Sequence, residues 1–367
     1  MNVFSIIYLL GAAQGFLLVA VLALRKTNVS SNRILALLLG LFSLNLLNLA
    51  AREYMPGNFS LLTAPFSLIY GPLIWLYVSS LTLNIDNKIR RFAILHFVPF
   101  FVAIFMYSPF FPLEISKYIM IILGFKIVQY AAYLTASLIV LKRHESFIRD
   151  FFSDIGSVTL QWLRIMIIID FISLSIVSFF MIMHVFDIYD ISAGRAVSRV
   201  TFIISSLVIY IIGYFSMKQP EIRQIAENRN DETDQPAKTS KYENSRIEDD
   251  IIAQYMKELS CYMEKEKPYL NSELTLKDLA DSMSLTYHDL SQVLNAGFKQ
   301  NFYNYINTFR IKEAKDILSD PKRSDNKILS IVYESGFKNK SNFNTFFKKI
   351  TGMTPSEYRK NAINYKK

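Results

Sequence analysis

The sequence predicts an all-α protein made of two unlike parts: a seven-helix transmembrane bundle, then a cytoplasmic all-helical domain with two helix-turn-helix units. Three observations support this prediction. Of 367 residues, 51% are hydrophobic and only 19% are charged, against about 25% in soluble proteins. Residues 1–217 contain 24 charged side chains, whereas the last 150 residues contain 47. Apolar residues recur at helical spacing in the C-terminal part. These features exclude a disordered chain and argue against a wholly soluble enzyme.

The first part contains seven apolar runs that approach the length a membrane-crossing helix needs, about 20 residues. The runs lie at 3–24, 34–50, 60–83, 92–108, 118–141, 162–186 and 196–217. The third run carries Pro65 and Pro72, which a membrane bundle tolerates because neighbouring helices can satisfy the freed backbone groups. We therefore predict that residues 1–217 form a seven-helix sensor-like domain.

Basic residues in the loops between these runs predict the orientation of the bundle, because cytoplasmic loops are rich in Lys and Arg. One set of loops carries Arg25, Lys26, Arg33, Lys88, Arg90, Arg91, Lys142, Arg143 and Arg149. The opposite set carries Arg52, Lys117 and Arg195. The prediction is a multi-pass protein of the bacterial inner membrane, with its N-terminus outside and its C-terminal domain in the cytoplasm. No basic residue precedes the first run, which favours a retained helix over a cleaved signal peptide.

Three ionisable residues inside the predicted spans are candidates for a signal site, since charge is costly in a bilayer. They are Lys126, Asp170 and His184. Asp170 is the strongest candidate, although a purely structural hydrogen bond explains it equally well. Lys126 can direct its amine toward the outer interface instead. His184 suits a packed or interfacial position better than a ligand site.

The chain offers no pattern typical of an active site or a metal site. Its single cysteine, Cys261, excludes an internal disulfide and a cysteine-based zinc cluster within one chain. The membrane part has no H-E-x-x-H sequence and no pair of carboxylates at a useful spacing. We therefore expect neither a cofactor nor a metal ion, and no enzymatic activity.

Composition changes abruptly after Met217. Residues 218–245 are polar and contain two prolines, which predicts a flexible linker. Residues 246–268 follow as a connecting amphipathic helix that ends before Pro268. Its apolar face must pack either on the next domain or on the same helix of a second subunit. The sequence does not choose between these, so a homodimer stays open.

The first predicted helix-turn-helix unit spans 274–295. Thr275 is placed to cap the first helix with Asp278 three residues later, and a turn at Ser284 separates the two helices. The second helix would bury Leu290, Val293 and Leu294. Its opposite face would carry Thr286, Tyr287, His288, Ser291, Gln292 and Asn295.

A longer helix, 301–318, leads to a second predicted unit. The first helix of this unit, 328–337, should end at Gly336, where a left-handed residue is wanted. The second helix covers 338–352. Thr354 before Pro355 then predicts a capped turn that closes the domain, 269–367.

The stretch 274–360 resembles the C-terminal domain of AraC/XylS-type bacterial transcription regulators. The resemblance rests on L-T-L-K-D-L-A-D, N-F-Y-N-Y-I-N-T-F-R-I-K-E-A-K-D-I-L, I-L-S-I-V-Y-E-S-G-F and F-F-K-K-I-T-G-M-T-P-S-E-Y-R, in this order. It implies two helix-turn-helix units whose recognition helices enter adjacent major grooves on one face of double-stranded DNA. It also implies regulation of transcription, often activation through contact with RNA polymerase.

This sequence departs from the family at two places. Val332 stands where the family usually has alanine, which predicts looser packing of the second unit. Thr345 and Phe346 replace the commoner Arg-Ala pair, which removes one expected contact. DNA binding by the second unit should then depend on Lys338, Asn339, Lys340, Ser341, Asn344, Thr345 and Lys348. Lysines neutralise phosphates, and the Asn339, Asn344 and Gln292 amides suit the major-groove edge of adenine.

Together these features predict a membrane-embedded one-component transcription regulator. Its partners would be the lipid bilayer, promoter DNA, RNA polymerase and an unidentified small-molecule or membrane signal. The alternative is a transporter or intramembrane enzyme with an attached DNA-binding reporter domain, in which Lys126, Asp170 and His184 would carry the chemistry. The lack of a motif pair and of an evident inverted repeat weakens that alternative.

Overall fold

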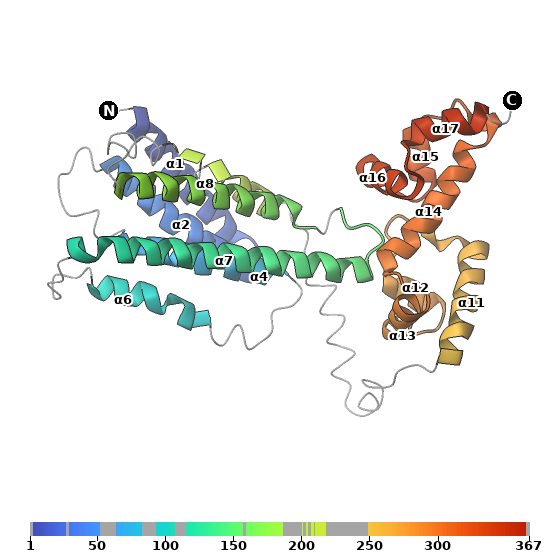
Figure 1. The fold of residues 1–367 in the computed structure, drawn as a ribbon, viewed down its shortest axis with the longest axis horizontal. Coiled ribbons are helices and arrows are strands. Elements are labelled where there is room, and N and C mark those ends of the chain that lie inside the picture. The colour runs from blue at the N-terminus through green and yellow to red at the C-terminus, as the bar shows by residue number, and fades with distance from the viewer. Residues whose placement is uncertain are drawn as a thin grey trace. The chain divides into compact units, whose positions relative to one another are not determined.

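The fold is described by a computed structural model of the chain. It describes residues 3–26, 29–51, 64–82, 93–106, 115–156, 159–185, 200, 203–204, 207–208, 210–217 and 249–364. Within these ranges the regular elements are helices, and no strand is formed (Figure 1). The chain divides into two compact units. Unit 1 is Met1–His144 with Leu160–Asn230, and unit 2 is Glu145–Thr159 with Asp231–Lys367.

Unit 1 contains long apolar helices. Its elements are α1 (Val3–Leu24), α2 (Val29–Ala51), η1 (Ala64–Phe66), α4 (Ser67–Leu81), η2 (Ala93–Phe97), α6 (Val98–Met106), α7 (Ile115–Phe151) up to His144, and α8 (Gln161–Val185). Residues 210–217 are also helical. Helices α1 and α2 pack along each other, and leucines from both fill the core, among them Leu22, Leu35 and Leu39.

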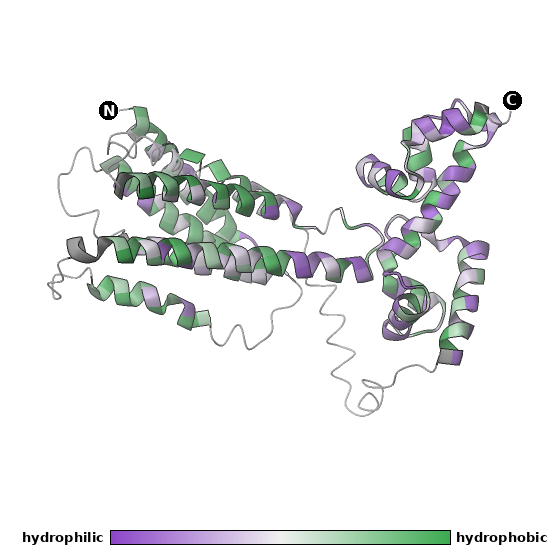
Figure 2. Cartoon of the chain, in the orientation of Figure 1, coloured by the Kyte–Doolittle hydropathy of each residue, from purple (hydrophilic) through white to green (hydrophobic). Residues whose placement is uncertain are grey.

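Four helices are long and apolar enough to cross a membrane: Val3–Leu24, Val29–Ala51, Met120–Phe151 and Gln161–Phe180. Ser67–Leu81 and Ala93–Met106 are apolar but shorter. Part of the seventh expected span, 196–217, lies outside the described residues, so the number of seven spans stays a prediction. Figure 2 shows the hydrophobic colouring of these helices, which changes near the C-terminal end of α7.

Helix α7 continues well beyond the end expected at residue 141. Residues 142–151 contain no proline or glycine that would stop a helix. Arg149 also donates to Glu145 one turn earlier, at 2.8 Å. Three basic residues that we expected in a loop, Lys142, Arg143 and Arg149, therefore lie on a helix.

Unit 2 contains the shorter helices of the C-terminal part. They are α11 (Asp249–Glu266), η3 (Pro268–Leu270), α12 (Leu276–Ser282), α13 (Tyr287–Gln292), the π-helical turn η4 (Val293–Gly297), α14 (Phe302–Leu318), η5 (Pro321–Arg323), α15 (Ile328–Glu334), α16 (Lys340–Thr351) and α17 (Pro355–Asn364). Figure 1 shows α14 running between two groups of helices, with α11, α12 and α13 at one end and α15, α16 and α17 at the other.

Helix α11 packs on its own chain, which answers a question that the sequence left open. Leu259 and Met263 are fully buried in one core with residues of α12, α13 and α14. Met256 lies so close to Gly297 of η4 that a Cβ there would approach its sulfur to 2.5 Å. Part of the apolar face of α11 is therefore covered by its own chain, whereas Ile251 near the start of the helix is exposed.

Candidate functional site

The first helix pair, α12 and α13, is built by two side-chain caps and a tight turn. The Thr275 hydroxyl accepts from the backbone N–H of Asp278, whose carboxylate accepts in return from the N–H of Thr275, as the sequence predicted. Thr286 caps α13 in the same manner through the N–H of Asp289. Between the helices, Ser284 adopts a positive φ of 56°, which reverses the chain.

The six residues predicted on the second helix of this pair occupy different environments. His288 and Asn295 are exposed, and the Asn295 amide donates to the Ser291 hydroxyl at 3.3 Å. Asn295 lies in the π-helical turn rather than in α13. Tyr287 is half-buried, with its ring centroid 6.2 Å from that of Phe151. Thr286 uses its hydroxyl in the cap, and Gln292 is half-buried.

The second helix pair, α15 and α16, is joined by a turn that requires glycine. Gly336 has a φ of +85°, as predicted from its place after the helix. A Cβ at this position would lie 2.4 Å from the carbonyl oxygen of Tyr269. Val332 is fully buried in this pair.

Helix α16 is strongly amphipathic. Phe343, Phe346 and Phe347 are buried on one side. The Asn339 side chain caps the helix by accepting from the N–H of Asn342 at 2.8 Å. The exposed side carries most of the residues that the sequence predicted for this unit, namely Lys340, Ser341, Thr345 and Lys348, while Asn344 is half-buried. The helix thus presents hydroxyl, amide and ammonium groups together.

Lys338, directly before α16, is held by an ion pair. Its ammonium group lies 2.9 Å from the carboxylate of Glu273, which precedes α12. The hydrogen bond to Glu273 raises the pKa of Lys338, and Asp154 contributes a smaller effect in the same direction. Both side chains are largely exposed, so this pair contributes little to stability. Its role is to link the approaches to the two helix pairs.

Arg310 of α14 forms the polar centre of unit 2, and sequence reasoning missed it. The side chain is fully buried, and burial lowers its pKa to about 10, so the guanidinium stays charged at neutral pH. It donates to the carbonyl oxygens of Tyr269 at 2.7 Å and Asn271 at 2.8 Å. It also donates to the carbonyl oxygen of Ser153 at 3.1 Å. The sequence did carry one signal for this role, because Arg310 stands among the apolar residues on the buried side of the predicted helix 301–318.

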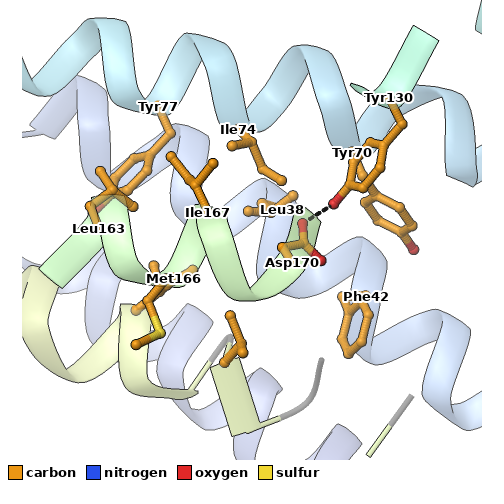
Figure 3. A pocket seen from close by; sticks show the side chains of 12 residues that line it. Leu38, Phe42, Tyr70, Ile74, Tyr77, Tyr130, Leu163, Met166, Ile167 and Asp170 are labelled. Carbon is orange, nitrogen blue, oxygen red and sulfur yellow. Dashed lines mark hydrogen bonds between the residues drawn. The ribbon is translucent and has the colours of Figure 1, made fainter. Parts of the chain in front are cut away.

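A separate pocket of about 80 Å³ lies among the apolar helices of unit 1 (Figure 3). Asp170 of α8 points into it and accepts a hydrogen bond from the hydroxyl of Tyr130 on α7. The other lining residues are mostly apolar, with Tyr70 and Tyr77 from α4 as further polar groups. These tyrosines were not predicted, because the sequence does not show which side of a spanning helix faces a cavity.

The pocket contains one of the three residues predicted for a signal site. Lys126 is half-buried on α7 but does not line the pocket. The side chain of His184 lies outside the described residues. Across the part of the chain that the structure describes, no three acidic, histidine or cysteine side chains are grouped as a metal site would need.

Comparison with known proteins bears on the helix pairs. Residues 279–361 match a protein family described as a helix-turn-helix domain. The C-terminal part of the chain is a helix-turn-helix domain. The match begins within α12 and includes α13, α14, α15 and α16. It overlaps almost all of the stretch 274–360, whose motifs resemble the AraC/XylS family.

Similar proteins share this domain and not the whole chain. The melibiose operon regulatory protein of Escherichia coli is 32% identical over 87 residues, which are 24% of this chain and 28% of that protein. The uncharacterized HTH-type transcriptional regulator YtdP of Bacillus subtilis is 32% identical over 88 residues, 24% of this chain and 11% of that protein. An uncharacterized HTH-type transcriptional regulator of Staphylococcus aureus is 29% identical over 91 residues, 25% of this chain and 12% of that protein.

The chain thus spans between 11% and 28% of the length of these relatives. The similarity covers the helix-turn-helix region alone. No solved structure matches the chain.

Proposed function

We propose that this chain is a membrane-embedded one-component transcription regulator that binds promoter DNA sequence-specifically. The observation that carries the proposal is the helix-turn-helix domain at 279–361, placed in the same chain as a set of long apolar helices. The relatives that share the domain are named as regulators of an operon or of transcription. We infer that the two helix pairs act as two helix-turn-helix units, with α13 and α16 as recognition helices.

The apolar surface of unit 1 supports its insertion in a bilayer. Large apolar side chains are exposed along its helices, where a soluble protein rarely shows them as one continuous set. Leu10 of α1 is 67% exposed and Ile121 of α7 is 72% exposed. Lipid would cover these side chains. The distribution of basic residues favours an N-terminus outside and a helix-turn-helix domain in the cytoplasm of a bacterial cell.

The exposed side of α16 supplies the chemistry that DNA recognition needs. Lys340 and Lys348 can neutralise backbone phosphates, which is the main source of affinity in such complexes. The Asn344 amide can donate to and accept from adenine in the major groove. In the first unit, Thr286, His288 and Asn295 are the exposed residues among the predicted contacts, and Thr286 also caps α13. Contact with RNA polymerase is an additional expectation from the family resemblance.

The pocket around Asp170 is our proposed signal site within the bundle. A carboxylate inside an apolar helix bundle is costly unless it has a partner, and Tyr130 provides one. An apolar signal molecule with a hydrogen-bond donor would satisfy Asp170 in place of Tyr130. Lys126 and His184 remain secondary candidates for this site.

The Asp170→Asn variant tests whether this pocket senses a signal. We expect it to lose the response of target transcripts to growth condition while the protein still binds DNA, because the substitution lies far along the chain from the helix-turn-helix domain. Tyr130→Phe is the matched variant from the other side of the hydrogen bond. A full transcriptional response in both variants would contradict the proposal that this pocket is the signal site. Loss of a transport or turnover activity would instead favour the alternative function.

The regulator function itself is tested by pairing two measurements. Transcript profiles of a deletion strain identify the dependent genes, and capture of genomic fragments by the purified full chain identifies the bound sites. We expect the bound sites to lie upstream of the dependent genes. Their symmetry or repeat spacing would also report whether the protein binds as a dimer. Bound sites unrelated to the dependent genes would contradict the proposal.

A further inference from the structure

The short segment that follows α7 is part of the same compact unit as the helix-turn-helix domain. We call residues 152–156 the docking segment; they follow the last residue of α7, Phe151, and belong to unit 2. Phe152 forms an isolated antiparallel bridge with Thr275, the N-cap of α12. Phe152 and Ile155 are buried at 9% and 7% exposure. The segment therefore packs as a built element of this unit.

Ser153 has its polar groups satisfied by unit 2. Its hydroxyl donates to the carbonyl oxygen of Leu274 at 2.6 Å, and its backbone N–H donates to the same oxygen at 3.3 Å. Its carbonyl oxygen accepts from the amide of Asn307 and from the guanidinium of Arg310, each at 3.1 Å. The Arg310 guanidinium also donates to the Ser153 hydroxyl at 3.0 Å. Five bonds from one buried serine define a specific binding surface.

Asp154 reaches the N-terminal end of α16. Its carboxylate accepts from the side-chain amide of Asn342 at 2.9 Å. Gly156 follows closely, since a Cβ there would lie 3.2 Å from the side-chain nitrogens of both Asn339 and Asn342. Asn339 is the N-cap of α16, and Asn342 is in its first turn. The docking segment thus contacts the N-cap and one first-turn residue of the helix that we assign to DNA recognition, while Lys340 and Ser341 stay exposed.

Asp154 lies at the end of α16 where a DNA-binding helix would contact DNA. The N-terminal residues of a recognition helix contact base edges. The positive end of the helix dipole attracts phosphate, and Asp154 offers it a carboxylate instead. The N-cap of α12 is held by the same segment through Phe152. The segment therefore contacts the N-terminal end of one helix in each pair, α12 in the first and α16 in the second.

We propose that the docking segment is an internal ligand of the helix-turn-helix domain that competes with DNA for the start of α16. This inference rests on the proposed DNA-binding function and adds the means of its control. In the docked state, Asn339 and Asn342 face the segment. In the DNA-bound state, the segment is withdrawn and these amides face the duplex.

Some hydrogen bonds of Arg310 in unit 2 do not involve the docking segment and would persist in the undocked state. Arg310 keeps its bonds to the carbonyl oxygens of Tyr269 and Asn271, both of which lie outside the segment. Water can replace Ser153 at the remaining N–H groups. The docked and undocked states are therefore both compatible with a folded domain.

The place of the segment in the chain connects it to the apolar helices. It directly follows α7, and α8 begins five residues after Gly156. A shift of either helix along its axis must move the segment, because so few residues intervene. Signal binding between α7 and α8, which contribute Tyr130 and Asp170 to the pocket, would reach the domain by this short path.

The first test measures DNA affinity of the full chain in lipid nanodiscs, using a pool of short genomic duplexes as the probe. Gly156→Leu adds an uncharged side chain against Asn339 and Asn342, and so displaces the segment without changing the charge that DNA meets. We expect about tenfold tighter binding, equivalent to losing one charge-assisted hydrogen bond of the docked state. Gly124→Leu in α7 is the matched control, since nothing lies within 4 Å of a Cβ there. It should bind as the unmodified protein does.

The second test follows the docked state directly. Asp154→Cys and Asn342→Cys in a Cys261→Ser background place two thiols where the carboxylate and amide now meet. With oxidised glutathione added as the two-electron oxidant, which leaves as two reduced glutathione molecules, we expect a disulfide to form without DNA and to be suppressed by the saturating duplex pool. The cross-linked protein should also lose most of its DNA affinity, and reduction should restore it.

Two results would overturn the proposal that the docking segment competes with DNA. One is unchanged or weaker DNA binding by Gly156→Leu. The other is a cross-linked protein that binds DNA as well as the reduced one does. A failure of the underlying function looks different, because no variant and no unmodified protein would then bind DNA in a salt-sensitive manner, while the disulfide would still report docking.

Discussion

Gly336 illustrates how much of the domain depends on single residues. The glycine has a φ of +85°, and a Cβ there would lie within 3.1 Å of three backbone atoms of Tyr269 and Leu270. These two residues belong to η3, which precedes the first helix pair. A side chain at 336 would therefore disturb both the turn of the second pair and its contact with η3. Gly352, which ends α16, also has a positive φ of 74° but no atom within 4 Å.

The Gly336→Val variant should be unable to form the native turn. We expect it to lose more than about 3 kcal/mol of unfolding free energy, because steric overlap adds to the cost of a left-handed β-branched residue. Gly352→Ala should lose only about 1–2 kcal/mol, the cost of the left-handed conformation alone. Urea unfolding of both variants measures the difference. Equal losses at the two positions would contradict the close contact with Tyr269.

Local residue chemistry was predictable, whereas long-range pairing was not. The sequence predicted the Thr275 cap with Asp278, the turn at Ser284 and the left-handed Gly336, because each depends on neighbours within a few positions. The bonds of Arg310 to Ser153 join residues 157 positions apart. No periodicity or spacing in the sequence records such a pair, so the buried centre of unit 2 became visible only in the structure.

At the scale of elements, α16 has the clearest division between a buried and an exposed side. Its phenylalanines pack against the domain, and its lysines and polar residues are exposed. Such a helix can contact DNA without losing its core. The resemblance to known regulators predicted this assignment, and the structure shows which of the predicted side chains are available. Lys338 is already paired with Glu273, whereas Lys340 and Lys348 extend from the exposed side.

Lys348→Ala should weaken DNA binding in a salt-dependent manner. Each phosphate contact releases about one counterion, so the slope of log affinity against log salt should fall by about 1. Lys265→Ala is the control, because this largely exposed lysine lies on α11, which is not one of the two proposed recognition helices. Anisotropy titrations at several salt concentrations provide the slopes. An equal change in both variants would show that Lys348 acts only through net charge.

The ends of elements were harder to predict than their existence. Helix α1 has the predicted bounds, 3–24, because Arg25 and Lys26 mark a sharp change in polarity. Helix α7 runs ten residues beyond its predicted end, since its polar continuation still favours a helix. The apolar face of α11 predicted a partner without identifying it. Packing of Leu259 and Met263 in unit 2 identified that partner.

At the scale of the whole molecule, charge and hydropathy separate the two parts of the chain. The sequence predicted this division from 24 charged residues in the first 217 and 47 in the last 150. The compact units follow the same division except at Glu145–Thr159, which the structure groups with the C-terminal helices. Composition could not predict this exception, because the composition of a short stretch between two apolar helices does not show which part of the chain it packs against.

The proposed orientation makes a direct prediction for reporter fusions. Alkaline phosphatase fused after residue 367 should be inactive in a bacterial host, and green fluorescent protein at the same position should fluoresce, because the basic loops favour a cytoplasmic C-terminus. A fusion within 52–59, in the loop set poor in basic residues, is the control and should show phosphatase activity. Activity at the C-terminus would reverse the orientation and separate the domain from chromosomal DNA.

The central claim, a DNA-binding regulator that works from within a membrane, is tested most directly by titrating the full chain in lipid nanodiscs with short genomic duplexes at increasing salt. We predict binding to a subset of duplexes, with log affinity falling linearly as log salt rises. Specific duplexes should bind at least about a thousandfold more tightly than the rest. The absence of salt-sensitive binding to any duplex would contradict the account.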